Sequence, residues 1–370
     1  ANLYMAFVLE RLTLQGIMGF DLLTLLAPEQ VVDLGNIVAP LPGNIAIPEG
    51  QQIRAIGDIP GTDYNVPIYH TPRVTDMSVV TGDVPLADAI LLANESGGNF
   101  GEFVSGLFDI LIPDQAGVLS DINVNADLSG QDIALSNPID ASVSVTVGNH
   151  PSGLGAIAFS VRYDMSGDTY YPTGFASVPQ NGGNVTVPAT GDGGPFAGMP
   201  LGIVVAASDI TNFTFQSSVI FQRNVSGAVT ADSFLAPPSG LDITGRTYTF
   251  TGGANPGVSP DPDLNVSEIT LAQRVAIPGS DQQVVRYPLI WKQVMPGDQT
   301  SFTLPKLPTS DEVGRTMPEL PSAENYFWFV TAYALTDGDP FDFDHYVFSS
   351  FNMRVTHGAR RGRNLLEAPA

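Results

Sequence analysis

Short runs of alternating apolar and polar residues, separated by glycine and proline, constrain this chain more than any other feature. Val143, Val145 and Val147 alternate with serine and threonine, which is the period-two pattern of a strand with one buried face. Glycine (38 residues) and proline (30 residues) together occupy 68 of the 370 positions and interrupt such runs throughout the sequence. We therefore expect a mainly β fold built from many short strands and turns.

The chain is long enough for several domains, and its composition changes near position 237. Residues 238–370 hold 10 basic and 15 acidic residues, a net charge of −5, whereas residues 1–237 hold 5 and 23, a net charge of −18. We predict tandem β-sandwich domains behind a less regular N-terminal region. The expected units are an N-terminal β-rich domain with one or two short helices at 1–128, a β-sandwich at 129–236, a second β-sandwich at 237–358 and a basic C-terminal tail at 359–370.

Two helices and one unusual strand are expected near the N-terminus. Apolar residues recur at helical spacing in 100–111, with Asn99 as a suitable N-cap, and Pro85 begins a shorter helical pattern that ends at Leu92. The segment 4–14 is apolar on both alternating faces apart from Glu10 and Arg11, which predicts a strand covered on both sides or a short buried helix. As a strand, it is either an internal strand of the first domain or a strand donated to the sheet edge of a neighbouring copy.

The C-terminal third carries short motifs that resemble a known domain family. The sequence TSFTLPKLP occupies 300–308, Leu320-Pro321 follows, and YFWFVTAYAL begins at Tyr326. Together these motifs resemble the second half of a fibronectin type III-like domain, an immunoglobulin-like β-sandwich. The resemblance implies that the Tyr326 hydroxyl closes a tyrosine corner and that Trp291 is the core indole of a preceding strand.

The net charge of −23 excludes some partners and favours others. An acidic surface repels nucleic acid and anionic membranes, so neither is an expected partner. The longest apolar stretch, 12–27, is interrupted by Gly16, Gly19 and Asp21, and no segment is predicted to span a membrane as a helix. The sequence starts at Ala1 without an initiator methionine, as a trimmed export precursor would. We therefore expect an extracellular or cell-surface location, with the periplasm as the alternative.

Few residues in the sequence suggest catalysis. Cysteine is absent, which excludes disulfides, thiolate metal sites and a cysteine nucleophile. The histidines are His70, His150, His345 and His357, and the sequence contains neither a G-x-S-x-G nor an H-E-x-x-H motif. We expect no enzymatic activity, no catalytic residue and no organic cofactor.

A run of carboxylates is the best candidate for a metal site. Asp337, Asp339, Asp342 and Asp344 lie within eight residues of one expected turn, where their charges repel one another. Calcium would relieve this repulsion, because it accepts several oxygen ligands in irregular loops. A solvated acidic turn is the alternative, and both interpretations stay open. Asp261 and Asp263 form a poorer second candidate.

We predict a non-catalytic exported protein that serves as a structural subunit or accessory of an extracellular or cell-surface assembly. Its expected partners are other protein subunits, including copies of itself. Arg360, Arg361 and Arg363 make the tail basic, so the tail is either flexible or a docking segment for an acidic neighbour. One alternative is a glycan- or protein-binding adhesion module, with Tyr170 and Tyr171 as exposed candidates beside a glycine-rich loop. The other is a hydrolase with accessory β-sandwich domains.

Overall fold

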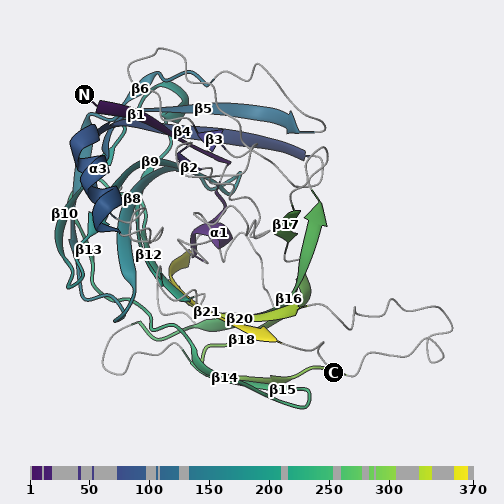
Figure 1. Ribbon diagram of the computed structural model, residues 1–370. Helices are drawn as coiled ribbons and strands as arrows, with labels where there is room; N and C mark the ends of the chain where they lie inside the picture. The colour runs from purple at the N-terminus through teal and green to yellow at the C-terminus, as the bar shows by residue number, and fades with distance from the viewer. Residues whose placement is uncertain are drawn as a thin grey trace.

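The protein is mainly β, as the sequence predicts (Figure 1). The structure is a computed structural model. Sheets account for most of the residues that it describes, and the helices are short. The described residues are 2–10, 12–18, 41–42, 52–53, 73–96, 106, 109–124, 133–209, 216–252, 260–276, 283–286, 289–305, 325–335 and 354–365.

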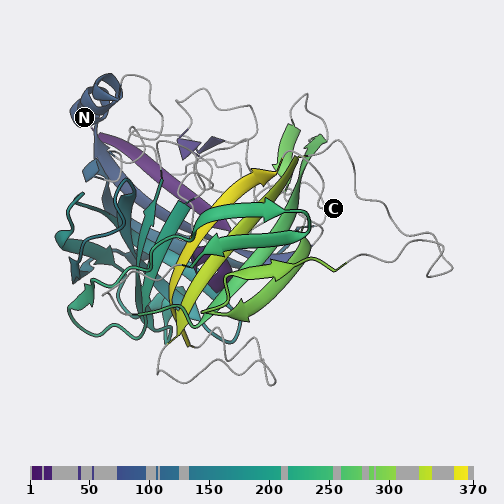
Figure 2. The same cartoon turned by 90° about the horizontal axis from the view of Figure 1, so that it is seen from below.

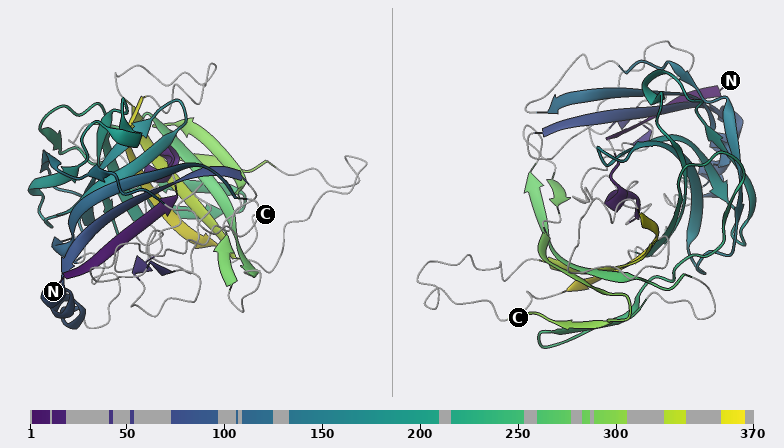
Figure 3. Two further views of the ribbon diagram at one scale, coloured as in Figure 1. Left: turned by 90° about the horizontal axis from the view of Figure 1, so that it is seen from above. Right: turned by 180° about the vertical axis from the view of Figure 1, so that it is seen from behind.

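The largest element is a curved, nine-stranded antiparallel sheet with one concave and one convex face (Figures 1 and 3). Its strand order is β17-β16-β20-β21-β12-β11-β8-β9, and β18 also pairs with β16. The strands are β8 (Gly155–Asp164), β9 (Thr169–Val178), β11 (Leu201–Ser208), β12 (Gln216–Gln222), β16 (Leu264–Ala276), β17 (Gln283–Arg286), β18 (Leu289–Pro296), β20 (Asn325–Leu335) and β21 (Val355–Leu365).

Two smaller sheets pack on the convex face and give the fold its sandwich-like layers. In the first, Val143, Val145 and Val147 are all buried against β8, β11 and β12, which confirms the predicted period-two strand. The second covers β16, β18 and β20. The first sheet has the order β10-β7-β13 and consists of β7 (Ala141–Val147), β10 (Gly183–Ala189) and β13 (Val229–Ala231). The second has the order β14-β15-β19 and consists of β14 (Ser239–Thr244), β15 (Thr247–Thr251) and β19 (Ser301–Thr303).

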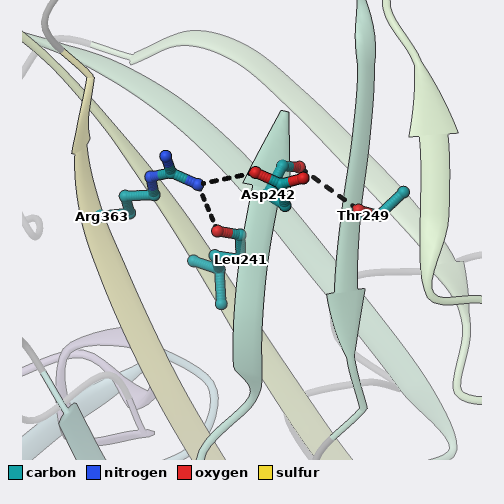
Figure 4. Close-up of polar contacts among 4 residues, drawn as sticks. All are labelled: Leu241, Asp242, Thr249 and Arg363. Carbon is teal, nitrogen blue, oxygen red and sulfur yellow. Dashed lines mark hydrogen bonds and ion pairs between the residues drawn. The ribbon is translucent and has the colours of Figure 1, made fainter. Parts of the chain in front are cut away.

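The nine-stranded sheet continues across the expected domain boundary near residue 237. Strand β21 pairs with β20 on one side and with β12 on the other, so the two predicted sandwiches share one sheet. Residues 359–365, predicted as the start of a basic tail, therefore lie inside a strand. The strand also contacts the covering sheet, because the Arg363 guanidinium donates to the Leu241 carbonyl and lies 3.5 Å from Asp242 Oδ1 (Figure 4).

A short helix, α1 (Leu14–Met18), fills the concave side of this sheet (Figures 1 and 3). Two backbone hydrogen bonds join Leu12 to Tyr170 of β9, and the Leu14 amide donates to Asp168 Oδ1 at 3.0 Å. Leu12, Leu14, Ile17 and Met18 are all at most 2% exposed. The N-terminal segment therefore supplies part of the central core rather than an outer layer.

The strand predicted at 4–14 pairs within its own chain. Strand β1 (Asn2–Glu10) runs antiparallel to β4 (Arg73–Pro85), and it is the end strand of a four-stranded sheet. This pairing corresponds to the internal alternative rather than to a strand donated to a neighbour. The sheet has the order β1-β4-β5-β6, with β5 (Ile112–Val124) and β6 (Asn137–Pro138), and a separate two-stranded parallel sheet consists of β2 (Leu41–Pro42) and β3 (Gln52–Ile53).

The helices bear out one sequence prediction directly. Helix α3 (Leu86–Glu95) begins after Pro85, close to the predicted range. Gly106, Asp109 and Ile110 are helical, whereas the rest of the helix predicted at 100–111 lies outside the described residues. A one-turn 3₁₀ helix, η1, spans Gly194–Phe196. Among the described residues, no helix has both the length and the apolar composition needed to cross a membrane.

The core indole of the C-terminal layers is Trp328 rather than Trp291. Trp328 is completely buried, and its Nε1 donates to Ser267 Oγ at 2.8 Å, whereas Trp291 packs at the margin of the same cluster and is half-buried. Tyr326 is also completely buried in this cluster. The predicted tyrosine corner and the resemblance to fibronectin type III domains stay predictions.

Candidate functional site

Helix α3 presents its larger apolar side chains to solvent. Ile90 is 54% exposed and Leu91 is 55% exposed, and Leu86 is also exposed. With about 100° of rotation per residue, these three, Ala87 and the polar Asn94 occupy the side of the helix that points away from the body. We call the set Leu86, Ala87, Ile90 and Leu91 the outward face of α3. Figures 2 and 3 show α3 projecting from a corner of the molecule.

The opposite side of α3 is fixed to the β4–β5 pair by a small apolar cluster. Ala89 and Leu92 pack against buried Val84 and Leu111. Leu92 approaches so closely that a Cβ atom at Gly106 would lie 2.3 Å from its Cδ1, so a larger residue there would require the Leu92 side chain to move. The inner face of α3 thus packs, partly buried, against the β4–β5 pair.

A serine caps the C-terminal end of α3, and acidic residues lie beside its outward face. At the C-terminal end, the Ser96 amide donates to the Leu92 carbonyl at 2.9 Å and its hydroxyl donates to the Ala93 carbonyl at 3.1 Å. Asp88 and Glu95 lie along one edge of the helix. In the sequence between 73 and 124, eight residues are acidic and only Arg73 is basic. The outward face is therefore an apolar surface in an acidic setting.

Ile112 is 58% exposed but does not belong to this surface. Its register partner on β4 is Asp83, which is adjacent to Val84, whose side chain packs under α3, and successive residues of a strand point to opposite faces. Ile112 consequently lies on the other side of the β4–β5 pair. The outward face of α3 is therefore limited to one helix.

Tyr170 and Tyr171, the predicted glycan-binding aromatics, are buried and not exposed. Tyr170 is 1% exposed and stacks on Tyr163 with ring centroids 5.5 Å apart. Burial raises the pKa of Tyr170 above its ordinary value. Tyr171 is 4% exposed and donates to Asp76 Oδ2 at 2.8 Å. Both residues contribute to the core, and the sequence prediction that they bind a ligand at the surface is wrong.

The predicted metal ligands are only partly covered by the structure. Asp337, Asp339, Asp342 and Asp344 lie outside the described residues, so the calcium site stays a prediction. Asp263 of the second candidate pair accepts a hydrogen bond from the Leu335 amide at 2.7 Å and so helps to fix the start of β16. In the part of the chain that the structure describes, no group of three His, Cys, Asp or Glu side chains is placed to hold a metal ion.

The structure describes two of the four histidines, His150 and His357, and they have different surroundings. The His150 ring makes an edge-on contact with Phe234, with ring centroids 6.4 Å apart. His357 Nδ1 lies 2.9 Å from Thr356 Oγ1 on β21. His70 and His345 lie outside the described residues.

His357 gives the protein a predictable pH dependence. Burial lowers the pKa of His357 to about 4, and the charge of Asp232 partly opposes this shift. Below the unfolded-state pKa of about 6.5, the unfolded chain binds a proton that the folded protein does not bind until about pH 4. His357 therefore destabilises the fold progressively as the pH falls from 6.5 to 4, by about 2 kcal/mol at pH 5.

Urea unfolding of the wild type and of His357→Gln at pH 7.5 and pH 5.0 measures this effect. The wild type should lose more stability than the variant between the two pH values, because only the wild type has this histidine. An equal loss in both proteins would mean that His357 does not titrate in this way.

No family model, no curated protein and no solved structure matches this chain. Its function is therefore inferred from the residues and their geometry alone.

Proposed function

We propose that this protein is a non-catalytic structural subunit of an extracellular or cell-surface assembly, and that the outward face of α3 contacts another subunit. The supporting observation is the exposure of Ile90 and Leu91 on a helix whose other side packs against Val84 and Leu111. A surface helix normally turns its apolar side chains toward the core. A cluster of exposed apolar side chains on one helix is typical of a surface that another molecule covers.

The charge around α3 favours a particular partner chemistry. Asp88 and Glu95 border the outward face, and the whole chain carries a net charge of −23. A second copy would bring like charges together, which disfavours association, whereas lysine or arginine on a partner would be attracted. We therefore infer a different protein with apolar side chains that are flanked by basic residues.

Substitution of the two most exposed side chains tests this proposal. Ile90→Gln and Leu91→Gln together remove the apolar surface but keep a high helix propensity, so the isolated protein should change in stability by less than about 1 kcal/mol. When the variant replaces the wild type in the source cells, its share in the large assembly should fall at least tenfold in size-exclusion chromatography.

Leu289→Gln is the matched control, because Leu289 is 51% exposed and lies on β18, away from α3. This variant should assemble as the wild type does. Normal assembly of the α3 variant would refute the contact. Assembly that consists only of copies of this chain, measured by light scattering on the purified protein, would refute the inferred basic partner.

A further inference from the structure

Arg360 on β21 is a buried arginine whose charge has no acceptor in the described part of the chain. The residue is 6% exposed, and its Nε is buried without a hydrogen-bond partner. Its guanidinium makes neither a hydrogen bond nor an ion pair with the described residues. It lies instead over the ring of Phe329, with Cζ 4.1 Å from the ring centroid. A buried donor of a cationic group without a partner is costly, so the unpartnered Nε of Arg360 requires an explanation.

A second unsatisfied donor lies directly beside it. Ser217 of β12 is the register partner of Arg360, is 1% exposed and has an Oγ that lacks a hydrogen-bond partner among the described residues. Both side chains are on the concave face, because Gly358, two residues before Arg360, abuts Met18 of α1. A guanidinium and a hydroxyl are therefore neighbours on the same face of the sheet.

Arg162, a second buried arginine, has acceptors for its terminal nitrogens, although its Nε, like that of Arg360, is buried without a partner. Arg162 donates to the Met199 carbonyl at 2.8 Å and to the Thr190 carbonyl at 2.6 Å. The closest acidic candidate by register, Glu268, forms an ion pair with Lys292 at 3.1 Å. Unlike Arg162, Arg360 therefore has no acceptor for its terminal nitrogens among the described residues.

We propose that Arg360 and Ser217 bind an oxyanion, a carboxylate or phosphate group, on the concave face of the sheet. A guanidinium presents a planar pair of donors that matches the oxygens of either group, and the Ser217 hydroxyl adds a third donor. The Phe329 ring beneath the guanidinium holds its plane and excludes water from one side. This site is independent of α3 and of the proposed assembly contact.

Anion-dependent melting of the purified protein tests the proposal, with sodium phosphate and sodium acetate compared with sodium chloride at equal ionic strength. The wild-type melting temperature should rise by a few degrees in phosphate or acetate beyond the chloride control. Arg360→Met retains the side-chain stem over Phe329 but has no charge, so this specific rise should disappear. The phosphate and acetate titrations together identify which oxyanion the site prefers.

Arg363→Met is the matched control, since Arg363 is on the same strand but 44% exposed and is already paired with Asp242. It should keep the specific rise. Ser217→Ala provides a second test that leaves Arg360 intact, and calorimetric titration with the preferred anion should give an affinity about tenfold weaker than that of the wild type. The proposal is overturned if the wild type has no anion-specific rise, if Arg360→Met keeps it, or if Ser217→Ala binds as tightly as the wild type.

Discussion

Trp328→Ala should lower the free energy of unfolding by about 3–5 kcal/mol, the range found for buried aromatic residues. Trp328 is completely buried at the centre of the layer between β14-β15-β19 and the nine-stranded sheet. Its ring makes edge-on contacts with Tyr248, Phe250 and Phe302. The substitution removes these contacts and leaves the Ser267 hydroxyl without its buried donor. Urea unfolding followed by circular dichroism measures the loss.

Trp291→Ala provides the comparison for the same residue type. Because Trp291 is half-buried at the margin of the cluster, its removal should cost less than half as much as that of Trp328. Equal costs for the two substitutions would contradict the assignment of Trp328 as the core indole.

Deletion of residues 1–18 should prevent folding altogether. The deletion removes β1 and α1, and with them Leu12, Leu14, Ile17 and Met18 from the core on the concave face. Loss of one buried leucine, isoleucine or methionine side chain typically costs about 2–5 kcal/mol, so four such losses reach or exceed the usual stability of a domain. Near-ultraviolet circular dichroism and amide NMR spectra of the truncated protein should lack native features.

Graded substitutions at Ile17 support the deletion, because a truncated chain can fail to fold for several reasons. Ile17→Val should cost about 1 kcal/mol and Ile17→Ala about 2–5 kcal/mol. A truncated protein that unfolds cooperatively at the wild-type temperature would show that α1 is not part of the core. It would also reopen the alternative that the N-terminal strand serves a neighbouring copy.

Local patterns in the sequence predict the type of secondary structure well. The alternation at Val143, Val145 and Val147 identifies β7, and Pro85 identifies the start of α3, because both signals depend only on neighbouring residues. The pairing of β21 with β12 could not be predicted in this way. It joins segments about 140 residues apart, and the glycines and arginines of 358–363 have a composition typical of a tail.

Burial was the property that local sequence predicted least well. Tyr170 and Tyr171 lie near glycine-rich turns and were expected at the surface, but β9 places Tyr170 in the core cluster with α1 and Tyr171 against β4. The exposure of Ile90 and Leu91 was missed for the converse reason. Their spacing is compatible with a core helix, and only the packing of Ala89 and Leu92 on the β4–β5 pair determines which side faces outward.

Hydroxyl-radical footprinting of the assembly isolated from its source cells tests the proposed function most directly. The oxidation rates of Ile90 and Leu91 are compared between the assembly and the isolated protein, with Leu289 as the internal reference of similar exposure. We predict that oxidation of Ile90 and Leu91 falls at least fivefold in the assembly while that of Leu289 changes little. Unchanged oxidation of Ile90 and Leu91 in the assembly would contradict the role of α3 as a subunit contact.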